Sequence, residues 1–215
     1  MQEILGLGMP AYVIIVVIII LISMTIHEAM HGFMAYFLGD NTAKNEGRLT
    51  LNPIKHIDPF LTIILPVLLA IVGAPIFGGA KPVPFNPHQV RYGEWGAALV
   101  AVAGPLTNLI LAFVCFGIST FIDPSSLVSG VLVLATIVNL GFFAFNILPI
   151  PPLDGSRLLY ALAPDFLRRL LEALEHAGLV MVFVLVLIAS GPLGAVIRTI
   201  ITFALDIFSA IFGVR

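Results

Sequence analysis

Charged residues, cysteine and polar linkers are all scarce in this sequence. Only 10% of the 215 residues are charged whereas 60% are hydrophobic, and the mean hydropathy of +1.11 excludes an ordinary soluble globular domain. The net charge is -2 and no basic cluster is present, so nothing in the sequence favours nucleic-acid binding. The composition is typical of a polytopic membrane protein whose partners lie in the lipid bilayer.

Cysteine occurs once, as Cys115, which excludes a disulfide framework and a cysteine-based metal site. No Ser/Gly-rich or charged linker divides the chain, so we expect a single membrane-embedded domain over residues 1–215. The first apolar run has no basic segment before it and is too long for a cleavable signal peptide. We therefore expect it to remain attached.

Long apolar runs are the main feature that the sequence does contain. A helix that crosses a bilayer needs about 20 mostly apolar residues, and five segments meet this length: 11–38, 94–121, 128–148, 173–190 and 193–213. A sixth apolar segment, 60–77, is interrupted by prolines and runs into a Pro-rich loop, 78–87. The predicted fold class is therefore an all-α polytopic membrane protein with five to six transmembrane helices.

The first apolar run carries the pattern HExxH at residues 27–31. Because positions four apart share one face of a helix, His27 and His31 can direct two imidazole nitrogens at one metal ion. Glu28, about a quarter turn away, can instead accept a proton from a water molecule there. Hydrogen bonding to neighbouring helices is the alternative for these side chains. An ionisable residue near the bilayer centre costs about 2.5–3.5 kcal/mol, however, so three within five residues favour a functional site.

The distribution of Lys and Arg predicts the orientation, because basic loop residues favour the cytoplasmic side. An N-terminus outside and a C-terminus in the cytoplasm accommodate nine of the ten basic residues, namely Lys44, Arg48, Lys55, Lys81, Arg91, Arg157, Arg168, Arg169 and Arg215. The exception is Arg198, inside the last predicted helix. In this scheme segment 60–77 and the loop after it must enter and leave on the cytoplasmic side, which predicts a re-entrant segment beside the HExxH residues.

A catalytic zinc usually has three protein ligands, so a third must be found. Asp154 is the leading candidate, because the orientation scheme places it at the cytoplasmic end of a helix parallel to the first. Prolines break the helix before it, and Gly155 permits a turn; an ordinary Asp-Gly turn is the alternative. The remaining histidines, which are expected at the surface or the membrane interface, are His56, His88 and His176.

Together these motifs resemble the site-2 protease family of intramembrane zinc metalloproteases. The resemblance covers roughly residues 14–160 and is carried by HExxH at 27–31, by N-x-x-P-x-P-x-x-D-G at 146–155, by the Gly-Gly-Ala-Lys-Pro-Val-Pro loop at 78–84, and by Ala103-Gly104-Pro105 with Asn108. It implies one zinc ion per chain held by His27, His31 and Asp154, with Glu28 as general base. It also implies cleavage of a transmembrane helix of another protein. The PDZ modules that the family often carries are not found in this chain.

Other residues are candidates for binding the substrate. The Asn146 amide is a candidate second donor to the oxyanion or a clamp on the substrate backbone, and Asn108 either bonds between helices or supports the metal site. The stretch 81–85 is expected to form a short β-hairpin-like loop. Its Val83 and Phe85 N–H groups would pair with an unwound substrate, because Pro82 and Pro84 leave the other edge without donors. A rigid structural loop is the alternative.

The function predicted from these residues is intramembrane proteolysis near the cytoplasmic face, over a catalytic core of about 11–160 followed by C-terminal helices at about 173–213. A metal-ion transporter is the main alternative, and Glu28 separates the two because a transporter would tend to use it as a ligand. A third possibility is an inactive scaffold. The presence of every motif residue argues against it.

Overall fold

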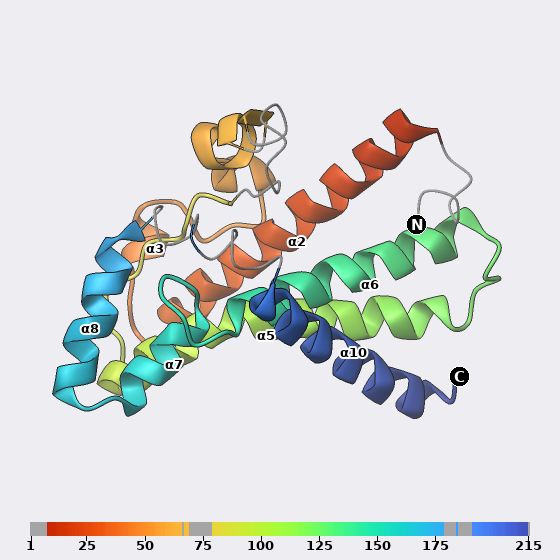
Figure 1. The fold of residues 1–215 in the computed structure, drawn as a ribbon. Coiled ribbons are helices and arrows are strands. Elements are labelled where there is room, and N and C mark those ends of the chain that lie inside the picture. The colour runs from red at the N-terminus through yellow and green to blue at the C-terminus, as the bar shows by residue number, and fades with distance from the viewer. Residues whose placement is uncertain (1–7, 66, 69–78, 179–183, 185–190, 215) are drawn as a thin grey trace.

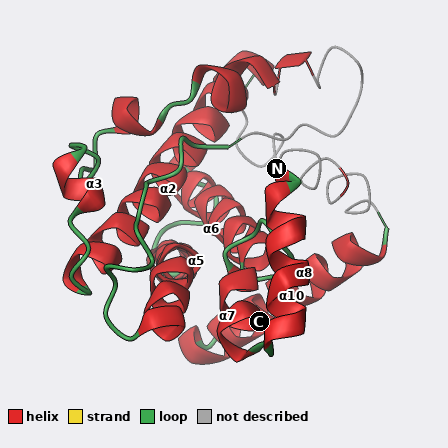
Figure 2. Ribbon diagram, turned by 90° about the vertical axis from the view of Figure 1, so that its left-hand side faces the viewer, coloured by secondary structure: helices red, strands yellow, loops and turns green. Residues whose placement is uncertain are grey.

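The computed structural model describes residues 8–214 except 66, 69–78, 179–183 and 185–190. Over these residues the chain consists of helices and loops with no strand (Figure 2), which confirms the all-α prediction. The β-hairpin-like form expected for the Pro-rich loop is therefore not found, because the described residues 79–86 are irregular loop. Two prolines in this stretch lack the N–H groups that a strand ladder needs.

Among the described residues, four helices are long and apolar enough to cross a membrane. They are α2 (Met9–Phe37), α5 (Gly93–Ser119), α6 (Leu127–Asn146) and α10 (Pro192–Phe212). They coincide with four of the five predicted segments, so the chain is a multi-pass membrane protein. Most of the predicted helix 173–190 and of the predicted re-entrant segment 60–77 lies outside the described residues.

Shorter elements connect the spanning helices. They are α3 (Thr42–Asn45), η1 (Pro53–His56), η2 (Pro59–Ile64), α7 (Gly155–Leu162) and α8 (Asp165–His176). Figure 1 shows α3, α7 and α8 at the end of the bundle where α2 ends and α5 begins. The helix expected to start near residue 173 is thus preceded by a separate amphipathic helix, α8, in which a charged residue recurs every few positions.

Helix α5 is the centre of the bundle and packs against both α2 and α6. Its start is fixed by two left-handed residues, Tyr92 with φ 70° and Gly93 with φ 54°. Alanines and Gly104 on its buried face allow α2 to approach closely, and Pro105 is accommodated inside the helix. This close approach brings the HExxH turn of α2 against the middle of α5.

Helix α10 runs in the direction opposite to the predicted one. Leu193, at its start, packs with Leu148 and Leu153 after the end of α6. The Phe212 ring, at its other end, lies 5.1 Å from that of Phe113 in the last part of α5. The C-terminal end of α10 therefore lies at the same end of the bundle as the start of α2 (Figure 1).

In the structure the start of α2 and the end of α10 lie at the same end of the bundle, whereas the predicted orientation placed the two ends of the chain on opposite sides of the membrane. The predicted direction of this helix came from the uncharged turn at Gly191-Pro192 before it and from Arg215 after it. In the observed direction Arg198 lies only six residues after Pro192, at the end of the bundle that carries the other basic loops.

Candidate metal centre

Two histidines of α2 form the core of the site. His27 and His31 lie one turn apart, and their rings meet edge to face with centroids 4.7 Å apart and an interplanar angle of 84°. Both side chains are buried, with 7% and 9% of their surface exposed. The Nε2 atoms face each other at 3.0 Å, as the i, i+4 spacing predicts.

Asp154 reaches the same point from the connection between α6 and α7. Its Oδ2 lies 3.1 Å from His27 Nε2 and 3.4 Å from His31 Nε2. The adjacent Gly155 allows this approach, because a Cβ there would collide with the Ile147 carbonyl oxygen.

The three ligand-type atoms have the spacing that zinc requires. In tetrahedral coordination with bonds of about 2.0–2.1 Å, neighbouring ligand atoms lie about 3.3 Å apart, and the observed separations are 3.0, 3.1 and 3.4 Å. His27 Nδ1 faces Asn108 Oδ1 at 2.5 Å and His31 Nδ1 faces the Val100 carbonyl at 2.8 Å. Both Nδ1 atoms thus donate, which leaves the lone pairs of both Nε2 atoms directed at the carboxylate oxygen. The two Nε2 atoms and the Asp154 Oδ2 are thus three electron-pair donors around one point, which is an arrangement that binds a cation.

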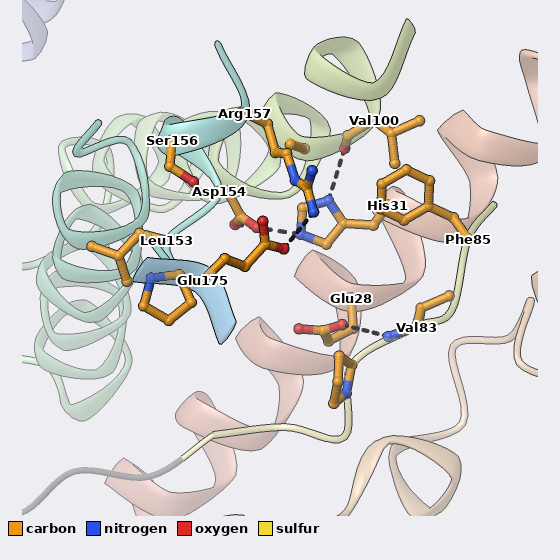
Figure 3. A pocket seen from close by; sticks show the side chains of 13 residues that line it. Glu28, His31, Val83, Phe85, Val100, Leu153, Asp154, Ser156, Arg157 and Glu175 are labelled. Atoms are coloured by element: carbon orange, nitrogen blue, oxygen red, sulfur yellow. Dashed lines mark hydrogen bonds and ion pairs between the residues drawn. The ribbon is translucent and has the colours of Figure 1, made fainter. Parts of the chain in front are cut away.

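Glu28 and Asp154 share a cavity of about 230 Å³ with His31 (Figure 3). The Val83 N–H donates to Glu28 Oε2 at 3.0 Å. The second carboxylate oxygen of Glu28 has no such amide donor, and Figure 3 shows it pointing away from Val83. Glu28 is therefore held beside the three ligand-type atoms without joining them.

The loop that carries Val83 is anchored at both ends by buried charged groups. One Arg48 guanidinium nitrogen donates to the Lys81 and Pro82 carbonyls at 2.8 and 3.3 Å. The Asp40 carboxylate accepts the Asn86 N–H at 2.6 Å and two hydrogen bonds from Thr42. Burial alone would raise the pKa of the Asp40 carboxyl, but these donors outweigh it and hold the pKa below its usual value.

Val83 and Phe85 both line the cavity. The Val83 N–H, which was predicted to pair with a substrate strand, is bonded to the Glu28 carboxylate in this structure. Asn108 contacts His27 directly. Asn146 is not among the residues that line this cavity, and its amide donates to the Phe142 carbonyl at 3.0 Å.

The other histidines lie apart from this cluster. His56 is buried rather than at the surface, with only 2% of its surface exposed, and its Nε2 meets the Thr50 carbonyl at 2.8 Å. His88 and His176 are exposed, as expected. The described residues of the chain contain one group of side chains able to hold a metal, and it consists of His27, His31 and Asp154.

Sequence reasoning missed an ion pair on the cavity wall. Arg157 of α7 and Glu175 of α8 bond to each other and both line the cavity (Figure 3). The signal for Arg157 was its position three residues after Asp154, which returns its side chain toward the same face once α7 forms. Glu175 had no local signal, because α8 was not predicted as a separate helix.

Paired histidines from one helix, a carboxylate from the α6–α7 connection and a nearby glutamate define a metallohydrolase-type centre built into a membrane bundle. Comparison of the sequence with known proteins supports the same class. Residues 122–190 match the family described as "Peptidase family M50". No solved structure gives a significant match.

Two relatives match this sequence over a larger part of the chain than the family model does. The chain is 39% identical over 210 residues to "Putative zinc metalloprotease YwhC" of Bacillus subtilis, which covers 91% of each chain. It is 35% identical over 170 residues to "Putative zinc metalloprotease Rip2" of Mycolicibacterium smegmatis, covering 77% of this chain and 64% of that protein. The chain therefore belongs to peptidase family M50, the site-2 protease family of intramembrane zinc metalloproteases.

Proposed function

We propose that this chain hydrolyses peptide bonds in transmembrane segments of other membrane proteins, using zinc held by His27, His31 and Asp154. The observation that carries the proposal is the convergence of these ligand atoms, all within 4.8 Å of one another. They lie beside Glu28, inside a bundle of membrane-length helices. The cavity of about 230 Å³ beside them has room for the water that hydrolysis consumes.

Each side chain has a distinct part in the proposed reaction. Zinc, when bound, supplies a Lewis acid and lowers the pKa of water to about 7. Glu28 accepts the proton of the attacking water at the carboxylate oxygen that Val83 does not engage, and passes it to the leaving amine. The Val83 N–H keeps this carboxylate in one orientation. Val83 and Phe85, as cavity-lining residues, contact the unwound substrate.

The roles of the two asparagines are assigned on different grounds. Asn108 supports the His27 ring through their direct contact. For Asn146 we retain the role of oxyanion donor or backbone clamp. That role requires the side chain to leave the Phe142 carbonyl when substrate binds.

We infer that the chain is one domain in the cell membrane, with a catalytic core over about 11–160. The loops at the site end of the bundle carry Lys44, Arg48, Lys55 and Lys81, so this end faces the cytoplasm. The start of α2 and the end of α10 then face outward. Cleavage near the cytoplasmic face would release a soluble fragment, as in regulated intramembrane proteolysis.

Purified protein incubated with a panel of single-span membrane substrates tests this function. We expect cleavage inside a transmembrane segment that stops with a zinc chelator and returns when zinc is added. Zinc-dependent ion uptake into proteoliposomes without cleavage of any substrate would instead favour the transporter alternative, for which the relatives provide no support.

A further inference from the structure

A chain of buried hydrogen bonds links His27 to helix α6. The His27 Nδ1 lies 2.5 Å from Asn108 Oδ1. The Asn108 Nδ2 donates to Asn139 Oδ1 at 2.8 Å, and the Asn139 Nδ2 donates to the Ala135 carbonyl at 2.9 Å. The chain therefore crosses three helices, α2, α5 and α6, and ends on a backbone carbonyl.

The backbone carbonyl fixes the polarity of every bond in this chain. A carbonyl oxygen can only accept, so Asn139 must present Nδ2 to Ala135 and Oδ1 to Asn108. Asn108 must then present Nδ2 to Asn139, which turns its Oδ1 to His27. As a result His27 Nδ1 carries the proton, and the lone pair of Nε2 faces His31 and Asp154.

Burial makes this arrangement rigid. Asn108 is 0% exposed and Asn139 is 3% exposed, so water cannot replace a lost partner. An asparagine in an apolar spanning helix is costly unless its amide is bonded. His31 needs no such chain, because its Nδ1 meets the Val100 carbonyl directly. The two histidines thus obtain the same tautomer by different routes, and only His27 depends on side chains.

We propose that Asn139 is a positioning residue for zinc binding, acting through Asn108 to hold the His27 ring in its metal-binding tautomer and orientation. This inference rests on the proposed metal site. It assigns to α6 a role in the centre beyond delivering Asp154 from the α6–α7 connection.

Zinc affinity of the purified protein, measured by competition with a chromophoric chelator, tests the proposal. Asn139→Leu keeps the approximate volume but removes the acceptor, and we expect zinc affinity to fall about tenfold or more, as for other partners of metal-bound histidines. Asn139→Asp keeps an oxygen that accepts from Asn108, and its protonated carboxyl can donate to the Ala135 carbonyl as Asn139 does, so it should stay near the wild-type affinity. The visible spectrum of the Co²⁺-substituted protein should change in Asn139→Leu only.

Thr136→Val is the matched control. Thr136 lies one turn earlier on α6, is 1% exposed, and bonds to the Leu132 carbonyl at 2.9 Å without reaching the site. It should lose thermal stability but keep zinc affinity. An equal loss of zinc affinity in Thr136→Val would show a general packing effect and overturn the proposal.

A double-mutant cycle tests whether Asn139 acts through Asn108. In an Asn108→Ala background, Asn139→Leu should have no further effect on zinc affinity, because the link is already broken. Additive losses would overturn the relay. If Asn139→Leu does not fold, Asn139→Ala removes the same acceptor and takes its place.

His27→Ala distinguishes a failure of the proposed metal site from a failure of the relay. Unchanged zinc affinity in His27→Ala contradicts the metal site itself. Unchanged zinc affinity in the Asn139 variants alone contradicts only the relay.

Discussion

At the scale of single residues, a missing side chain is as important to the centre as the ligands. Gly104 of α5 faces the two histidine rings, and a Cβ there would lie 2.8 Å from His27 Cε1 and closer still to the His31 ring. Contacts this short are not tolerated between carbon and ring atoms, so α2 and α5 pack at their observed distance only because this position has no side chain.

Gly104→Ala should therefore displace both rings and weaken zinc binding. Overpacking typically costs about 1–3 kcal/mol, which corresponds to roughly 5- to 150-fold in affinity. Gly141→Ala on α6, where nothing lies within 4 Å of an added Cβ, is the control and should bind zinc as the wild type does. Chelator competition on both variants measures the difference, and equal affinities would contradict the packing argument.

Some residues of the metal centre were predictable from the sequence and others were not. The pairing of His27 with His31 follows from helix geometry alone, so a local pattern was sufficient. Asp154 is distant in sequence and required the second motif. Asn139 gave no usable signal, because a lone asparagine in an apolar helix has many structural uses and its partner Asn108 is 31 residues away.

At the scale of elements, the loop over residues 79–86 depends for its shape on bonds from other segments. It has no strand or helix of its own, and buried charged anchors hold it against α2. Gly32 of α2 makes room for it, since an added Cβ would lie 3.0 Å from Val83 Cγ1.

Acidification should loosen this loop through Asp40. The pKa of Asp40 is lowered in the folded protein, so its contribution to stability is fully present above its ordinary pKa of about 3.9 and is lost as pH falls through the lowered value. Asp40→Asn should lower stability at pH 7 by about 1–3 kcal/mol, and its difference from wild type should shrink below about pH 4.

Thermal unfolding across this pH range measures the effect. Asp165→Asn, exposed at the start of α8, is the control and should change stability by no more than about 0.5 kcal/mol. A difference between Asp40→Asn and wild type that stays constant down to pH 3 would refute the assignment.

Val83→Pro tests the link from the loop to the general base. Proline removes the N–H that Glu28 accepts, so we expect cleavage to fall at least about tenfold below that of Val83→Ala. Zinc content should stay equal in the two variants. Equal cleavage rates would show that the Val83 amide has no part in the reaction.

Hydropathy predicted the spanning helices well because apolar length is a property of each segment alone. Hydropathy did not predict α8, because this helix is amphipathic and mixes charged with apolar residues. The irregular loop at 79–86 was also beyond sequence patterns, since its path depends on Arg48 and Asp40, which bond to it from other segments.

At the scale of the whole molecule, the start of α2 and the end of α10 lie at one end of the bundle, and α7, which directly follows Asp154 of the metal centre, lies toward the other (Figure 1). The direction of α10 was not predictable, because a helix with so few flanking charges has a weak orientation signal. Its packing against α5 and α6, through Ala112, Leu140, Ala204 and Phe208, determines the direction instead.

Topology reporters should confirm this arrangement. Fusions after residues 45, 88 and 162 should read as cytoplasmic, whereas fusions after residue 125 and at the C-terminal end should read as external. A C-terminal reporter on the same side as residue 88 would contradict the observed direction of α10.

The central claim is that a zinc-bound centre with Glu28 as general base cleaves membrane-spanning substrates. Glu28→Gln tests it most directly, because the substitution removes the base and keeps the three proposed ligands. Zinc content and cleavage of a single-span substrate are measured on the same preparation. The account predicts wild-type zinc content and a loss of cleavage of about 100-fold or more; cleavage at the wild-type rate, or loss of the zinc, would contradict it.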